Sequence, residues 1–177
     1  MSSEGSLLQT LGIDLIQAAK NELEFLKLVD NYPTLCKGPV VKNAIRRYEL
    51  FWLPFTSTSP KVSFQAAPLD IAWVWHAHML APGYYEEDCI NIIPTVLDHT
   101  PLNKTQRNLA LQLTRDRWHK AFPGEPFEVD LTKPPTVLTE YRSRIQYNLE
   151  EACYRQFKFY YQVSLPHFTD DCFSRVL

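Results

Sequence analysis

The residues best suited to chemistry are crowded into one short segment of this 177-residue sequence. Two tryptophans and two histidines occur within six positions, an aspartate precedes them, and a tyrosine, a second aspartate and a cysteine follow: Asp70, Trp73, Trp75, His76, His78, Tyr84, Asp88 and Cys89. Imidazole nitrogen and thiolate sulfur are good ligands for first-row transition metals. The candidate ligands of one transition metal ion such as zinc are therefore His76, His78, Cys89 and His99.

The spacing of the two histidines decides whether one ion can take both. Residues i and i+2 share a face on a strand, but on a helix they point about 200° apart. The run after Pro68 has a helical pattern, in which His76 lies with Leu69, Ala72, Trp73 and Leu80, and His78 lies with Ile71, Val74 and Trp75. The pattern therefore favours two buried structural imidazoles, each hydrogen-bonded to a carboxylate or a carbonyl, and no cofactor.

Other catalytic arrangements have weaker support, and no catalytic residue is predicted. Cys89 with His76 or His99 is a conceivable nucleophilic dyad, but a lone cysteine near histidines is more often a packed thiol. No G-x-S-x-G elbow is present in the sequence. The acids of residues 86–88 are typical of a solvated helix start.

The elements that position these residues are predicted to be mainly helices. Predicted helices cover residues 14–31, 38–54, 68–81, 84–97, 103–122 and 136–164, the last of which is either one helix or two with a break near Asn148. Asp14 is the expected N-cap of the first helix, with Ile16, Ala19, Leu23 and Leu26 facing inward, and Pro54 is expected to end the second. Asn103 and Gln106 form a capping box. The aromatic tail, Phe157 to Val163, is expected to be deeply buried, and Val62–Phe64 is a short strand candidate.

These elements predict an all-α fold, an irregular bundle of about six helices with long proline-containing loops, in a single domain over residues 1–177. The net charge of −2 argues against an electrostatically driven nucleic-acid binder. Neither a signal peptide nor a stretch long enough to span a membrane is visible, and the four cysteines form no C-x-x-C pair. A cytoplasmic location with free thiols is therefore expected.

The sequence resembles the glycine-rich domain-containing protein-like family. The matching stretches are residues 47–54, 68–80, 84–89, 96–99, 118, 121–127 and 156–165, and Trp75-His76-Ala77-His78-Met79-Leu80 is the most specific of them. The resemblance implies a domain of unassigned biochemistry, in which Asp70, Trp75, His76 and His78 are motif positions without an established role. Longer relatives carry a second Trp-His-x-His segment, so the chain is either a short form or the N-terminal part of a longer family domain.

The leading functional prediction is a non-catalytic α-helical protein-interaction module with a structural Trp/His segment. Its expected partner is another protein or a second copy of itself, with no membrane and no nucleic acid. The alternative is a metal-dependent enzyme or metal-binding protein that uses His76 or His78 with His99, Cys89 or a carboxylate. A weaker alternative, RNA association, comes only from the RNA-recognition domains found in some relatives.

Overall fold

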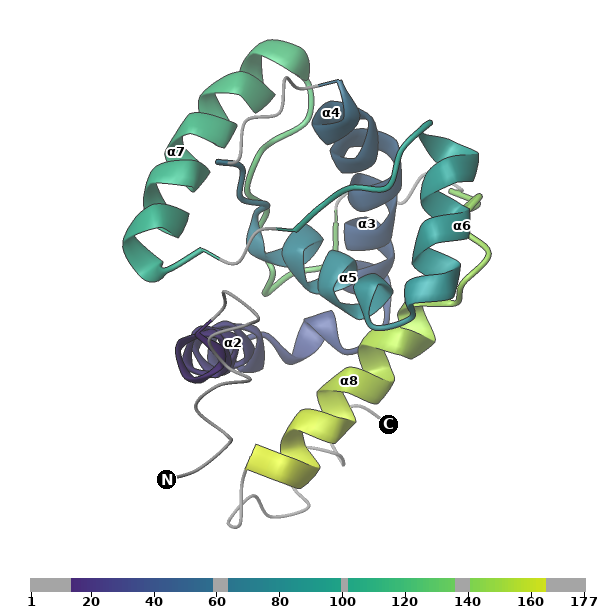
Figure 1. Ribbon diagram of the computed structural model, residues 1–177. Helices are drawn as coiled ribbons and strands as arrows, with labels where there is room; N and C mark the ends of the chain where they lie inside the picture. The colour runs from purple at the N-terminus through teal and green to yellow at the C-terminus, as the bar shows by residue number, and fades with distance from the viewer. Residues whose placement is uncertain (1–13, 59–63, 100–101, 136–140, 165–177) are drawn as a thin grey trace.

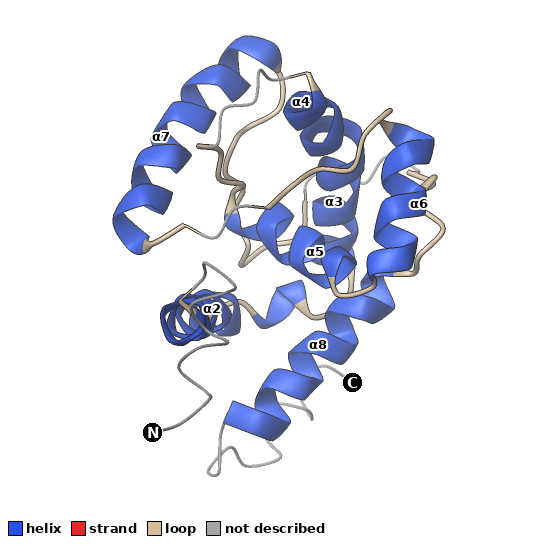
Figure 2. Cartoon of the chain, in the orientation of Figure 1, coloured by secondary structure: helices blue, strands red, loops and turns tan. Residues whose placement is uncertain are grey.

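Helices are the only regular elements in the described parts of the chain, which are residues 14–58, 64–99, 102–135 and 141–164 of a computed structural model (Figures 1 and 2). A 3₁₀ turn, η1, and a π-helical turn, η2, accompany the α-helices. The elements in order are α2 (Leu15–Asp30), η1 (Pro33–Leu35), α3 (Pro39–Arg47), η2 (Tyr48–Trp52), α4 (Leu53–Ser57), α5 (Leu69–Met79), α6 (Pro82–Ile92), α7 (Lys104–Ala121) and α8 (Leu149–Ser164). The prediction of an all-α fold is confirmed.

Local capping explains where several helices begin. The Asp14 side chain accepts a hydrogen bond from the Gln17 backbone N–H at 3.0 Å, which caps α2 as predicted. The predicted capping box of α7 is also present, because Asn103 and Gln106 each accept a bond from the other's backbone N–H. Helices α3 and α6 begin with a proline, which lacks the N–H that would have no partner there.

The second predicted helix continues past Pro54, where it was expected to end. Its core-facing residues Val41, Ala44, Ile45, Tyr48 and Trp52 are all buried. The π-helical turn precedes the proline, and the Leu53 N–H donates to the Tyr48 carbonyl five residues back. Pro54 thereby falls in the first turn of α4, where its missing N–H costs little, and the chain stays helical to Ser57.

Helix α5 lies at the centre of the molecule and carries the Trp/His segment (Figure 1). It packs against α2, α3, α6 and α8. Helices that are apolar on all sides are characteristically buried, and seven of the eleven residues of α5 are buried: Asp70, Ile71, Trp73, Val74, Trp75, Ala77 and His78. No helix in the described ranges is long and apolar enough to cross a membrane.

The last helix is shorter than predicted. It begins at Leu149, whereas residues 141–148 form an irregular segment and Thr136–Glu140 lie outside the described residues. Buried carboxylates on α6 and η2 accept hydrogen bonds from backbone N–H groups of this segment, which replace the bonds of a helix. Helical periodicity carries no information about these distant partners.

Two expectations about local burial were wrong, and a strand candidate lies mostly outside the described residues. Ile16 and Leu23 are exposed on α2, where Val29 is the fully buried side chain. In the aromatic tail Phe157 and Tyr160 are buried but Phe159 is 57% exposed, because only one face of α8 meets the core. Of the strand candidate 62–64, residue 64 is not in a strand and the other two lie outside the described residues.

Candidate functional site

The two histidines of α5 lie in separate environments, as their helical spacing predicts. His78 packs among tyrosines, at ring-centroid distances of 5.8 Å from Tyr48 and 5.1 Å from Tyr85. His76 instead stacks on Trp73 at 5.7 Å and approaches Phe25 of α2 at 5.6 Å. The two imidazoles therefore have different neighbours.

The His78 ring is fully enclosed and has polar groups at both nitrogens. Its Nδ1 lies 3.0 Å from the Tyr48 hydroxyl, with which it shares a hydrogen bond. Its Nε2 lies 3.3 Å from a carboxylate oxygen of Asp88, close enough for an ion-pair contact although not aligned as a hydrogen bond. Burial lowers the pKa of His78, while the Asp88 carboxylate opposes that shift. His78 is buried as predicted, but its hydrogen bond is to the Tyr48 hydroxyl and not to the predicted carboxylate or carbonyl.

Asp88 also anchors the segment that covers His78. Its carboxylate accepts hydrogen bonds from the Gln146 and Tyr147 backbone N–H groups at 2.8 and 3.3 Å. The Tyr147 ring is nearly parallel to the His78 ring, with 6.1 Å between the ring centroids. The Tyr84 ring also stacks on Tyr147, at a centroid distance of 5.0 Å. Each oxygen of the Asp88 carboxylate thus has a partner within the chain.

Asp70 belongs to a buried ionic network that sequence reasoning missed. It pairs with Arg47, whose side chain is fully buried and also donates to Glu125 at 3.0 Å. The same guanidinium donates to the carbonyls of Pro126 and Phe127, each at 2.7 Å. A signal was present, because Arg47 follows Val40 and Ala44 at the spacing of a core-facing helix stripe.

The other motif side chains are also used internally. The indole N–H of Trp73 donates to the Leu35 carbonyl at 3.0 Å, and that of Trp75 donates to the Tyr85 hydroxyl at 3.0 Å. The Tyr85 hydroxyl in turn donates to the Leu97 carbonyl. Cys89 is a fully buried free thiol, and burial raises its pKa, which disfavours the nucleophilic thiolate.

His76 departs from the prediction of a buried, hydrogen-bonded imidazole. Its side chain is 19% exposed, and its Nε2 lies 3.6 Å from a carboxylate oxygen of Glu22, too far for a hydrogen bond. Loss of hydration lowers the pKa of His76 to about 4. The ring is less enclosed because it lines a cavity between α2 and α5.

This cavity has a volume of about 490 Å³ and a mixed lining. Its polar side chains include Glu22, Gln65, His76, His99 and Arg107. His99 packs edge-on against Trp75 at 4.9 Å, and loss of hydration together with the nearby His76 lowers its pKa. Apart from Asn21, the other lining residues are apolar: Leu15, Ala18, Ala19, Phe25, Ala66, Ala67, Ala72, Trp75, Met79 and Leu102.

The four candidate metal ligands do not form one cluster. His78 faces Asp88 on α6, whereas His76 and His99 line the cavity on the α2 side. Throughout the described ranges, no three side chains of histidine, cysteine, aspartate or glutamate lie close enough together to hold a metal ion. Metal binding by these residues stays a prediction without geometric support.

Comparison with known proteins gives a consistent result. A model of the glycine-rich domain-containing protein-like family matches residues 2–88 and 84–176. Glycine-rich domain-containing protein 1 of Arabidopsis thaliana is 37% identical over 174 residues, which cover 92% of this chain and 21% of that protein. Glycine-rich domain-containing protein 2 of the same plant is 33% identical, with 92% and 22% covered. The chain spans about a fifth of the length of these relatives, and no solved structure is significantly similar to it.

Proposed function

Because this chain belongs to the glycine-rich domain-containing protein-like family, for which no biochemistry is assigned, we propose that it is a non-catalytic helical interaction module with a structural Trp/His segment. In this proposal α5 organises the core and a different surface meets the partner. The module is proposed to act in the cytoplasm, as one domain over residues 1–177.

One observation carries the structural role: the polar groups on the enclosed side of α5 are used within the chain. Asp70 pairs with Arg47, and His78 meets Tyr48 and Asp88. The two indole N–H groups donate to Leu35 and Tyr85, as described above. Catalytic groups must reach a substrate, whereas these groups are buried and already engaged.

The proposed partner is another protein or a second copy of this chain. Support comes from Leu109 and Leu113, which lie one turn apart on α7 and are 50% and 47% exposed. Apolar side chains placed together on an exposed helix face are typical of protein contact sites. In the Arabidopsis relatives the matching region is one part of a much longer chain, which also suits a module.

The structural role is tested by replacing His78 with alanine. We expect H78A to lower the free energy of unfolding by about 2–4 kcal/mol, because it opens a cavity and leaves the buried Tyr48 hydroxyl without its hydrogen-bond partner. The matched control is H119A on the exposed face of α7, which we expect to change stability by less than about 0.5 kcal/mol. Urea denaturation followed by circular dichroism gives both values. Equal stability of the two variants would contradict the proposal.

Elemental analysis separates this proposal from the metal-dependent alternative. The module is expected to purify without stoichiometric zinc or another transition metal, and to bind none tightly when titrated. A retained metal that is lost on replacement of His76 or His99 would favour the alternative, since those two side chains line one cavity.

A further inference from the structure

The cavity between α2 and α5 combines an apolar lining with a charged group and a polar atom that lack partners. We propose that it is a binding site for a small aromatic carboxylate that also carries a hydrogen-bond donor. The carboxylate lies on Arg107, the donor meets the Gln65 side-chain oxygen, and the ring lies among the apolar side chains. The proposal does not depend on the interaction partner proposed above.

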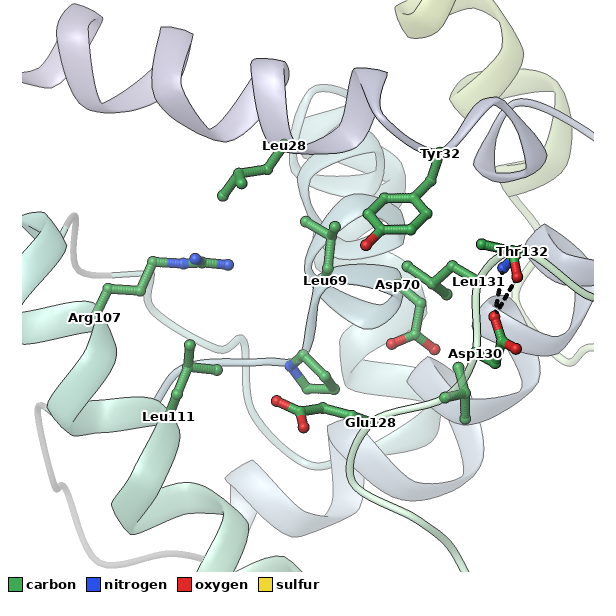
Figure 3. A pocket seen from close by; sticks show the side chains of 12 residues that line it. Leu28, Tyr32, Leu69, Asp70, Arg107, Leu111, Glu128, Asp130, Leu131 and Thr132 are labelled. Carbon is green, nitrogen blue, oxygen red and sulfur yellow. Dashed lines mark hydrogen bonds between the residues drawn. The ribbon is translucent and has the colours of Figure 1, made fainter.

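Arg107 supplies the cation. Figure 3 shows its side chain reaching from α7 toward Leu28 and Leu69, at the boundary with a second cavity of about 390 Å³. No carboxylate in the described residues forms an ion pair with Arg107. Burial lowers the pKa of Arg107, which shows that the guanidinium has lost part of its hydration. A guanidinium that has lost hydration without gaining a counter-ion is stabilised by a bound carboxylate, which it grips through two parallel N–H donors.

The carboxylates of the second cavity do not provide that counter-ion. Asp70 pairs with Arg47, Glu128 with Arg115 at 2.6 Å, and Asp130 with Lys133 at 3.3 Å. These acids make the second cavity unfavourable for an anion. The larger cavity is the better site, because Glu22 is the only carboxylate among the described residues of its lining.

Gln65 supplies an unsatisfied acceptor. Gln65 is one of the residues that line the larger cavity, and its side-chain oxygen is buried and has no hydrogen-bond partner in the described part of the chain. A buried acceptor without a partner costs about 1–3 kcal/mol. A ligand hydroxyl or N–H group would remove that cost.

The remaining lining determines the body of the ligand. Phe25 and Trp75 present aromatic surface, and Ala18, Ala72 and Met79 leave room beside it. Burial keeps His76 and His99 largely uncharged near neutral pH, so Arg107 is the permanent cation of the cavity. Glu22 projects from α2, and burial raises its pKa. A volume of about 490 Å³ lies within the usual range for small-molecule sites.

The test uses three probes that share a naphthalene ring, with calorimetric titration at about pH 7.5 on the full chain. 6-Hydroxy-2-naphthoate carries both groups, 2-naphthoate lacks the hydroxyl, and 2-naphthol lacks the carboxylate. We expect 6-hydroxy-2-naphthoate to bind at least about 10-fold tighter than 2-naphthol and several-fold tighter than 2-naphthoate. No saturable binding of 6-hydroxy-2-naphthoate up to about 2 mM would overturn the proposal.

Variants locate the site. R107Q is expected to weaken 6-hydroxy-2-naphthoate about 10-fold and to leave 2-naphthol unchanged, whereas K120Q, which removes an exposed charge from the same helix, has no effect. Q65L is expected to abolish the advantage of the hydroxyl, and A18L to weaken all three probes by filling the cavity. Thermal unfolding without probe verifies that each variant is folded. Equal affinity of the folded R107Q and wild-type proteins for 6-hydroxy-2-naphthoate would overturn the proposal.

Discussion

The two sides of α5 differ in how completely they are closed. His78 is fully enclosed, whereas the His76 side chain, two positions earlier, is 19% exposed at a cavity wall. The same residue type in the same helix has thus acquired two different environments. The difference shows that the role of a motif histidine depends on the elements packed across from it.

The facing residues explain why one side closes and the other does not. Three tyrosines surround His78, and the segment 141–148 lies over it, held by Asp88. Beside His76 the cavity lining includes five alanines: Ala18 and Ala19 on α2, Ala66 and Ala67 just before α5, and Ala72 on α5 itself. Alanine side chains are too short to fill the space between α2 and α5, so a cavity remains there.

Removing Asp70 from the buried ionic network of α5 is expected to have a large effect on stability. D70A leaves the fully buried Arg47 with one carboxylate fewer, and an imperfectly paired buried charge is expensive. We expect the free energy of unfolding to fall by about 3 kcal/mol, measured by urea denaturation. The matched variant D116A, at an exposed site on α7, is expected to change stability by less than about 0.5 kcal/mol. A loss at D70A no larger than that of D116A would show that the stability of the core does not depend on this ion pair.

Sequence reasoning located the helices better than it located their ends. Amphipathic stripes and caps predicted α2, α3, α5, α6 and α7, because those signals are local. The helical conformation after Pro54 and the irregular segment 141–148 were missed. The first depends on a π-helical backbone hydrogen bond, and the second depends on carboxylates that are distant in sequence. A periodic pattern of apolar residues contains no information about either.

For the candidate site, too, only features that lie within one helix could be predicted from the sequence. The helical spacing of His76 and His78 was enough to predict their divergence, which is a property of one helix. The Arg47–Asp70 pair and the roles of Gln65 and Arg107 in the cavity were missed, because they arise where α3, α5 and α7 come together. The composition of the opposing helix, rather than the motif itself, determined which histidine is open.

Lowering the pH should destabilise the protein through His76, on the open side of α5. Its pKa is about 4 in the folded state against 6.5 as the ordinary value, so the unfolded chain binds more protons between these pH values. Stability contributed by the uncharged ring is therefore present above about pH 6.5 and is lost as the pH falls toward 4. We expect wild-type protein to lose about 2 kcal/mol more than H76Q between pH 7 and pH 5, measured by urea denaturation.

The H76Q comparison isolates one group among several that titrate nearby. His78 and His99 also have lowered pKa values, and the raised pKa of Glu22 acts in the opposite direction, but all three are present in both proteins. The difference between the two curves therefore reports His76 together with its effect on the pKa of His99. Parallel curves for wild type and H76Q would mean that His76 is as hydrated as in the unfolded chain, and the cavity side would be more open than described.

The smallest expected effect concerns the segment that closes the His78 side. Burial by itself raises the pKa of Glu49, but hydrogen bonds from Ser143, Tyr141 and Arg144 outweigh it and lower that pKa. E49Q weakens these charge-assisted bonds, so we expect about 1 kcal/mol less protection of residues 141–148. Hydrogen exchange in peptides from that region should become about 5-fold faster, and E87Q, an exposed site on α6, should leave it unchanged. If exchange at 141–148 is the same in both variants, Asp88 alone holds the segment over His78, and the closure of this side rests on one carboxylate instead of two.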